Sequence, residues 1–170
     1  MGALSGDERR TLEAALARLI PADEAPGAVE AGVADYIDGL LDAFAFDPPR
    51  IFAGGPYSGR FGGAASFADW LPLGRLEEQA WRLRIGEWQR AYAAGLAALG
   101  ADFVDLTPDE QDARLTANAA FTSLMYEHAC EGMYGPPEYG GNRDLGGWRY
   151  IGFDGDTQPR GYTDEEVAQP

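Results

Sequence analysis

The sequence predicts an all-α fold, a small helical domain of about four main helices, and three observations support this prediction. Apolar residues recur at helical spacing in four separate stretches of the chain. Two of these stretches begin with residues typical of a helix N-terminus. No segment of strand length alternates apolar and polar residues. The chain has 170 residues, of which 45% are hydrophobic, so it can bury the core of one domain.

The first half of the chain predicts two helices. Ser5 and Glu8 have capping-box spacing and are followed by leucines at helical intervals, which predicts a helix over residues 6–19. The segment 21–27 contains two prolines and interrupts the pattern. From Ala28 onward the apolar residues again share one face, which predicts a second helix that ends before Asp47. A short helical turn is expected over residues 67–71.

The second half of the chain predicts two longer helices. Apolar residues from position 73 to 99 predict the longest helix, which Gly100 would end. Thr107, Pro108 and Glu110 supply a cap residue, a first-turn proline and a capping-box glutamate. They predict a last helix that runs to about Glu131, where Gly132 would end it.

Two glycine-rich and aromatic-rich segments lie outside this pattern. The first, residues 47–65, is an irregular loop within a helical domain of residues 1–132, and the second, residues 133–170, is expected to form an irregular C-terminal clasp of the same domain. Ordering many glycines is entropically unfavourable, so the aromatic side chains must stabilise these segments. Their anchoring surface is either the chain's own helices or another protein.

Composition excludes several classes of function. The formal charge of −15 disfavours binding to nucleic acid, and the absence of lysine rules out Schiff-base chemistry in this chain. One cysteine and one histidine leave no basis for a metal cluster. The paired glycines lack the flanking strand and helix of a nucleotide fingerprint, so we expect no cofactor in this chain. No stretch is long enough to enter a membrane, and no apolar segment follows the N-terminus, which favours a cytoplasmic location for the sequence as given.

The end of the last predicted helix carries side chains of types that can act in catalysis. His128 and Cys130 are two positions apart, which points their side chains in different directions and favours packing over a catalytic pair. Glu127 and Glu131 share a helix face and could pair with an arginine of the tail, Arg143 or Arg149. An independent small enzyme with His128 as acid or base remains an alternative, as does a binding module that encloses a small molecule.

The tail carries a recognisable pattern. It reads Tyr139-Gly-Gly-Asn-Arg-Asp144, then Gly147-Trp148, then Ile151-Gly-Phe153 and finally Gly161-Tyr162. Together with Leu19-Ile-Pro-Ala-Asp23 and the segment 26–37, it resembles the gluconate 2-dehydrogenase subunit 3 family over nearly the whole chain.

The resemblance implies a non-catalytic small subunit. Its partner would be a large subunit of the glucose-methanol-choline oxidoreductases, which binds FAD and oxidises a sugar, a sugar acid or an alcohol, with a cytochrome c subunit in some members. Many family members carry a twin-arginine export signal, whereas Arg9-Arg10 here has no apolar segment behind it, so a periplasmic location would require export with the complex. Aromatic and arginine side chains are frequent interface anchors. The residues expected at the partner interface are Phe52, Tyr57, Tyr139, Gly140, Gly141, Asn142, Arg143, Trp148, Tyr150 and Phe153.

Overall fold

A computed structural model describes residues 2–54 and 69–153 of the chain, and it is all-α apart from one minimal pair of strands. The main helices are α1 (Gly6–Leu19), α2 (Val33–Leu41), α3 (Arg75–Leu99), α4 (Pro108–Ala117), α5 (Ala119–Tyr134) and α6 (Gly146–Ile151). Short 3-10 helices occupy Ala43–Ala45, Phe103–Asp105, Pro137–Tyr139 and Arg143–Leu145. The strands are β1 (Ala53–Gly54) and β2 (Asp69–Trp70), which pair antiparallel. The all-α prediction is therefore confirmed.

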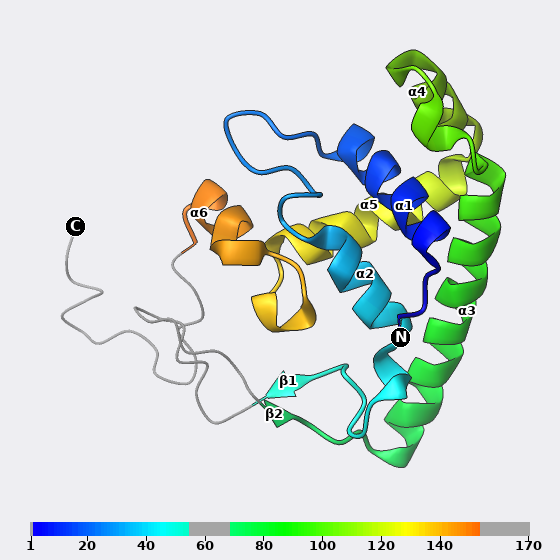
Figure 1. Cartoon of the computed structure of the whole chain (residues 1–170). Helices are drawn as coiled ribbons and strands as arrows, with labels where there is room; N and C mark the ends of the chain where they lie inside the picture. The colour runs from blue at the N-terminus through cyan, green and yellow to red at the C-terminus, as the bar shows by residue number, and fades with distance from the viewer. Residues whose placement is uncertain (1, 55–68, 154–170) are drawn as a thin grey trace, which may run out of the picture.

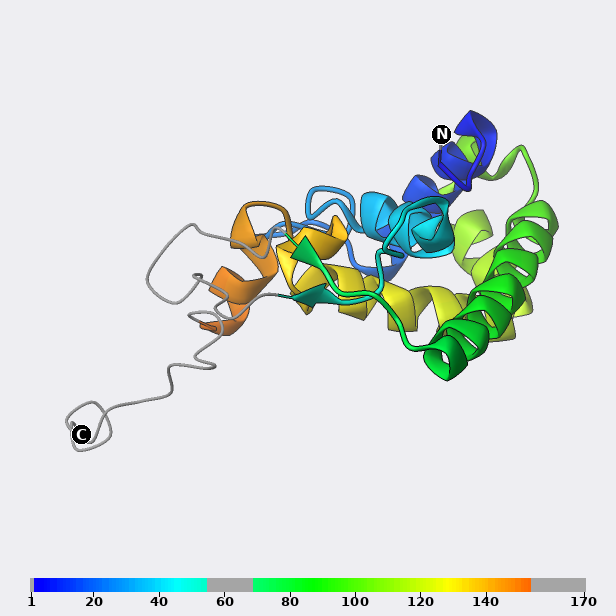
Figure 2. The same cartoon turned by 90° about the horizontal axis from the view of Figure 1, so that it is seen from below.

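Helices α1, α2, α3 and α5 surround one core, which α4 closes at one end (Figure 1). The fully buried side chains of this core come from all of these helices and include Leu12, Leu16, Ile37, Tyr92 and Met125. In Figure 2 the molecule is elongated, with α3 near one end and α6 near the other. The strand pair joins α2 to α3 below this core.

The predicted caps are present. The Ser5 hydroxyl oxygen accepts a hydrogen bond from the Glu8 N–H, and the Ser5 N–H donates one to the Glu8 carboxylate, so α1 begins as predicted. Thr107 and Glu110 form the same reciprocal pair at the start of α4. Gly100 caps the end of α3, as expected.

The second helix is shorter than predicted at both ends, because residues 28–32 form turns and α2 ends at Leu41, before the 3-10 helix Ala43–Ala45. Gly32 has a φ of +75°, in the left-handed region, and breaks the helical path before Val33. The Ala31 carbonyl accepts a hydrogen bond from the Arg143 N–H at 3.0 Å. In a longer helix this carbonyl would instead accept a hydrogen bond within the helix. The apolar pattern that suggested one helix is satisfied by buried turn residues, including Ala28.

The last predicted helix is two helices. Asn118 leaves helical geometry, with φ −109° and ψ +42°, and its side chain donates to the Arg114 carbonyl, which ends α4. Helix α5 then continues past Gly132 to Tyr134. Gly132 stays helical because it gives Tyr36 room: an added Cβ would lie 2.9 Å from the Tyr36 ring. The prediction of a stop at this glycine was therefore wrong.

Two irregular segments also contain more regular structure than expected. The expected helical turn at 67–71 was wrong where the structure describes it, because Asp69 and Trp70 form β2. The tail, expected to be irregular, contains two 3-10 helices and α6. Residues 55–68 and 154–170, which include most of the 47–65 loop and Tyr57, lie outside the described residues.

Candidate functional site

The tail is fastened to α5 by one buried asparagine. Asn142 is fully buried and has a left-handed backbone, with φ +46°. Its side-chain amide donates to the Gly135 carbonyl at 3.0 Å, and its Oδ1 accepts from the Gly147 N–H at 3.0 Å. Its own N–H donates to the Gly132 carbonyl at 2.7 Å. Asn142 thus joins the end of α5 to the start of α6, and asparagine is among the residues that tolerate this backbone geometry best.

Two glycines let the tail backbone lie directly on the α5 backbone. A Cβ at Gly141 would lie 2.1 Å from the Gly132 carbonyl oxygen, and one at Gly147 would lie 1.9 Å from the Met133 carbonyl oxygen. Neither contact is sterically allowed, and both neighbours are backbone atoms that cannot rotate away. The glycine pairs of the tail therefore serve close packing of two backbones rather than binding of a phosphate.

Trp148 packs inside the chain. Only 4% of it is exposed, and its indole N–H donates to the Tyr134 carbonyl at 2.7 Å. Phe153 meets it edge to face with the ring centroids 4.9 Å apart. Trp148 therefore anchors α6 on α5, and its indole does not reach the surface in the free chain.

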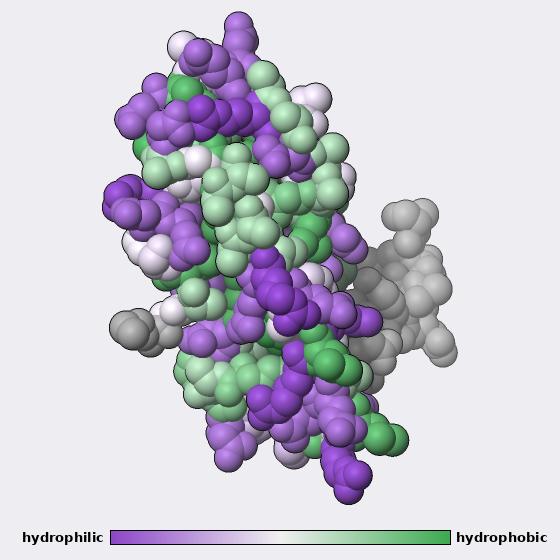
Figure 3. Space-filling view, turned by 90° about the vertical axis from the view of Figure 1, so that its right-hand side faces the viewer, coloured by the Kyte–Doolittle hydropathy of each residue, from purple (hydrophilic) through white to green (hydrophobic). Residues whose placement is uncertain are grey.

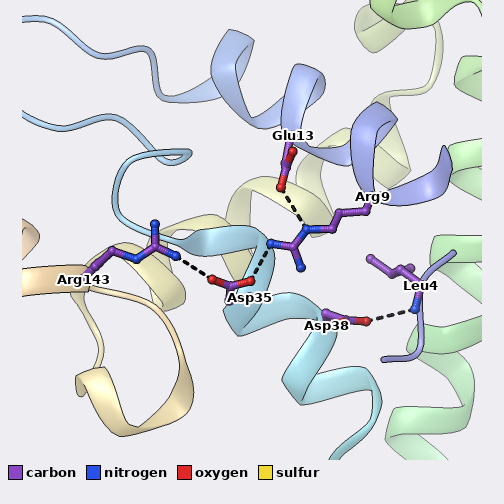
Figure 4. Close-up of polar contacts among 6 residues, drawn as sticks. All are labelled: Leu4, Arg9, Glu13, Asp35, Asp38 and Arg143. Carbon is purple, nitrogen blue, oxygen red and sulfur yellow. Dashed lines mark hydrogen bonds and ion pairs between the residues drawn. The ribbon is translucent and has the colours of Figure 1, made fainter. Parts of the chain in front are cut away.

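An ion-pair network ties the tail to the first two helices (Figure 4). Arg143 pairs with Asp35 at 2.6 Å, and Arg9 pairs with the other oxygen of the same carboxylate and with Glu13. The sequence suggests that Glu127 or Glu131 pairs with Arg143 or Arg149, but in the structure Arg143 pairs with Asp35 of α2 instead. Glu131 accepts a hydrogen bond from the Tyr36 hydroxyl at 2.7 Å.

A pocket of about 750 Å³ lies beside this network, between α2, α3, α5 and the residues that follow α5. Its walls are aromatic. Trp81 and Trp88 of α3 meet edge to face at 6.2 Å, and Trp70 of β2 meets Tyr139 at 5.4 Å. The Tyr139 hydroxyl accepts a hydrogen bond from the Ala53 N–H at 2.9 Å, which holds the strand pair against the tail. The pocket is thus assembled from both halves of the chain.

The polar groups of the pocket carry both signs of charge. Glu127 and Glu131 come from α5, whereas Arg84 comes from α3 and lies over the Trp81 ring at 5.1 Å. Burial and the hydrogen bond to Glu131 raise the pKa of Tyr36, so this phenol stays protonated at neutral pH. A surface with aromatic faces and charges of both signs suits a protein partner or a polar small molecule.

His128 lies behind this pocket and does not line it. It is 1% exposed, its ring is stacked on Tyr92, and the Tyr92 hydroxyl lies 3.0 Å from its Nδ1. Trp88 meets the imidazole edge to face at 4.7 Å. Burial lowers the pKa of His128, which Glu131 and Glu127 partly offset. This geometry describes a packed core histidine and disfavours the alternative of a His128-centred enzyme.

Exposed aromatic and aliphatic side chains gather where α6 meets α5. Tyr150 is 64% exposed, Ile151 55% and Phe153 45%. Tyr126 is exposed on α5, and a hydrogen bond with Cys130 raises its pKa. We call Tyr150, Ile151 and Phe153 the tail patch. Such grouped exposed apolar side chains are typical of interaction surfaces.

The residues expected at the partner interface separate into three groups. Gly141, Asn142 and Trp148 are buried and hold the tail. The other described ones are at least partly exposed: Phe52, Tyr139, Gly140, Arg143, Tyr150 and Phe153. Tyr57 lies outside the described residues. Their role toward a partner stays a prediction.

Among the described residues, no group of three or more acidic, histidine or cysteine side chains is placed to hold a metal ion. Over the same residues, no helix has the length and the apolar character that a membrane crossing requires.

The sequence did not predict the pocket. Trp81 and Trp88 lie within the segment 73–99, whose apolar residues predict only a helix, and Tyr36 lies within the second predicted helix. The available signal was that four aromatic residues of the pocket wall, Trp70, Trp81, Trp88 and Tyr139, occur in or after the irregular segments. Whether they come together depends on tertiary structure.

Comparison with known proteins supplies the family. The model of the family described as gluconate 2-dehydrogenase subunit 3 matches residues 6–155. Neither the curated proteins nor the solved structures contain a significant match. The matched region spans helices α1 to α6, the Asn142 linkage and the tail patch. The chain belongs to the gluconate 2-dehydrogenase subunit 3 family.

Proposed function

We propose that this chain is the non-catalytic small subunit of an FAD-dependent dehydrogenase of the glucose-methanol-choline type, and that it binds and stabilises the large subunit. The observation that carries the proposal is the family match over residues 6–155. FAD and the reacting groups would belong to the large subunit. This chain would supply contact surface, and a cytochrome c subunit could complete the assembly.

The tail patch and the rim of the pocket support this proposal as the contact surface. Aromatic side chains gain large contact area with little loss of rotamer freedom, which suits binding anchors. Tyr150 and Phe153 present such area, and Arg143, about half exposed in its ion pair with Asp35, is a separate candidate contact. The rigid Asn142 linkage positions these side chains before binding, which reduces the entropy lost on association.

The test is co-purification with the large subunit of the same source. Tagged wild-type chain should retain a flavin-containing protein. Tyr150→Ala should weaken the association at least about tenfold, as expected for an aromatic anchor. Val104→Ala is the matched control, because Val104 is also exposed but lies at the other end of α3 from the strand pair.

Two results would contradict the proposal in different ways. If no flavoprotein is retained by the wild-type chain, the subunit function is wrong. If a flavoprotein is retained equally by Tyr150→Ala and by a Tyr150→Ala/Phe153→Ala double variant, the function stands but the tail patch is not its contact surface.

The aromatic pocket favours a second candidate function, a small-molecule binding module. Its volume of about 750 Å³ falls in the range of ligand sites. Sugars and aromatic cations would stack on Trp81 and Trp88, so they should quench tryptophan fluorescence in the free chain. Loss of the quenching in Trp88→Leu, with no flavoprotein retained by wild type, would favour this function over the first.

A further inference from the structure

The outer face of α3 is apolar although it faces solvent. Leu76 is 77% exposed and Leu83 is 71% exposed, more than the other large hydrophobic side chains of the described residues. Ala80, Ala94 and Ala98 continue the same stripe at helical spacing. Figure 3 looks onto this face and shows apolar side chains along much of its length, separated by charged groups.

The two halves of this face differ in shape. The N-terminal half carries the protruding leucines, whereas the C-terminal half is hollowed by a shallow groove of about 500 Å³. Ala91, Ala94 and Ala98 of α3 line one side of the groove, and Ala119 and Ala120 of α5 line the other. Small side chains leave room for a foreign leucine between the helices.

We propose that a second copy of this chain covers the face, with the two α3 helices antiparallel across a twofold axis at Glu87. Leu83 and Ala91 lie four positions on either side of Glu87, and Leu76 and Ala98 lie eleven positions on either side. The axis therefore brings both leucines of one copy onto both alanines of the other at once. The protruding half of each copy thus fits the hollowed half of the other, which is the self-complementarity that a twofold interface requires.

Charge supports the same arrangement. The α3 helix has four arginines and three glutamates, a net charge of +1, in a chain whose total is −15. Two copies that meet through α3 therefore bring together helices that do not share the large negative charge of the chain. At the axis the two Glu87 carboxylates face each other, and Arg90 of each copy lies one turn along, within reach of Glu87 of the other.

The size of the face sets the expected strength. A 25-residue helix is about 37 Å long and 10 Å wide, so α3 alone offers about 400 Å² per copy. This is about half of the 800 Å² per partner found in stable interfaces. The dimer is therefore weak and concentration-dependent, with the α5 side of the groove adding to its area. It lies at the opposite end of the molecule from α6, so it leaves the tail patch free (Figure 2).

Disulfide trapping tests the register of the full-length chain in a Cys130→Ser background, which removes the single native cysteine. Glu87→Cys should form a linked dimer under mild oxidation, because this position meets itself at the axis. Leu76→Cys alone should link poorly, and Leu76→Cys combined with Ala98→Cys should link well. Val104→Cys is the control for random collision. Equal linking of Glu87→Cys and Val104→Cys would overturn the proposed axis.

Sedimentation tests the association itself. The mean mass of the wild-type chain should rise toward two copies over an approximately hundredfold range of concentration. Leu83→Arg should remain monomeric, whereas Leu71→Arg, at an exposed position outside α3, should dimerise like wild type. Unchanged circular dichroism would verify folding of both variants. A wild-type chain that stays monomeric throughout, or a Leu83→Arg variant that loses only a co-purified flavoprotein, would overturn the proposal.

Discussion

Replacement of Asn142 by alanine tests the structural basis of the tail. The change removes the donor to the Gly135 carbonyl and the acceptor of the Gly147 N–H, both within the tail's contact with α5. A buried backbone group without a partner costs about 1–3 kcal/mol, and alanine in a left-handed conformation adds about 1 kcal/mol. We therefore expect Asn142→Ala to lower the free energy of unfolding by about 3 kcal/mol.

Urea unfolding of the full chain, followed by circular dichroism, measures this change. Asn142→Gly separates the two contributions, because glycine accepts the left-handed backbone but makes neither side-chain hydrogen bond. It should lose about 2 kcal/mol, less than alanine. Asn142→Asp keeps the acceptor for Gly147 and should fall between wild type and alanine. A loss below about 0.5 kcal/mol for Asn142→Ala would show that the tail is not held by this side chain.

Three further predictions concern the helices. Gly95→Ala should destabilise by about 2 kcal/mol or more, because its Cβ would lie 2.2 Å from the Phe121 ring of α5. Gly86→Ala on the same helix should stabilise by about 0.5–1 kcal/mol, because its Cβ would make only an ordinary contact, 3.6 Å from the Arg90 guanidinium. Thermal unfolding of the pair would contradict this if both shifts had the same sign. Burial lowers the pKa of His128 in the folded state, so protonation favours unfolding and the free energy of unfolding should fall as pH drops below about 6.5. His128→Phe should lose this dependence in urea titrations at several pH values. A variant with the same pH profile as wild type would contradict the argument. Asp35→Asn breaks two half-exposed ion pairs, including the one to Arg143, and should lower the free energy of unfolding by no more than about 1 kcal/mol. The difference from wild type should shrink at high salt. A larger, salt-independent loss would show that the network is shielded from solvent.

Local signals in the sequence were sufficient for the helices with strong termini. These signals each act within one helical turn. The capping pairs at Ser5 and Thr107 predicted where α1 and α4 begin, and Gly100 predicted where α3 ends. The failures occurred where distant residues decided. Gly132 remains helical because Tyr36 packs on it.

The candidate site shows the same division. The tail signature indicated the family, but the burial of its residues could not be read from the pattern, because an asparagine or a tryptophan can serve either a core or an interface. Asn142 and Trp148 became core residues through contacts with the backbone of α5. The pocket joins Trp70 and Tyr139, which are far apart in the chain, so no local period could indicate it.

The attachment of the tail also determines when the subunit is complete. Arg143 hydrogen-bonds to Ala31, and Asn142 requires the N–H of Gly147, so the last described segment closes against residues made early in translation. A nascent or truncated polypeptide that ends before Gly147 lacks half of this linkage and cannot hold α6 against α5. The exposed side chains of α6 thus take up their places on α5 only after synthesis has passed that point, so a shortened chain would lack the ordered tail altogether.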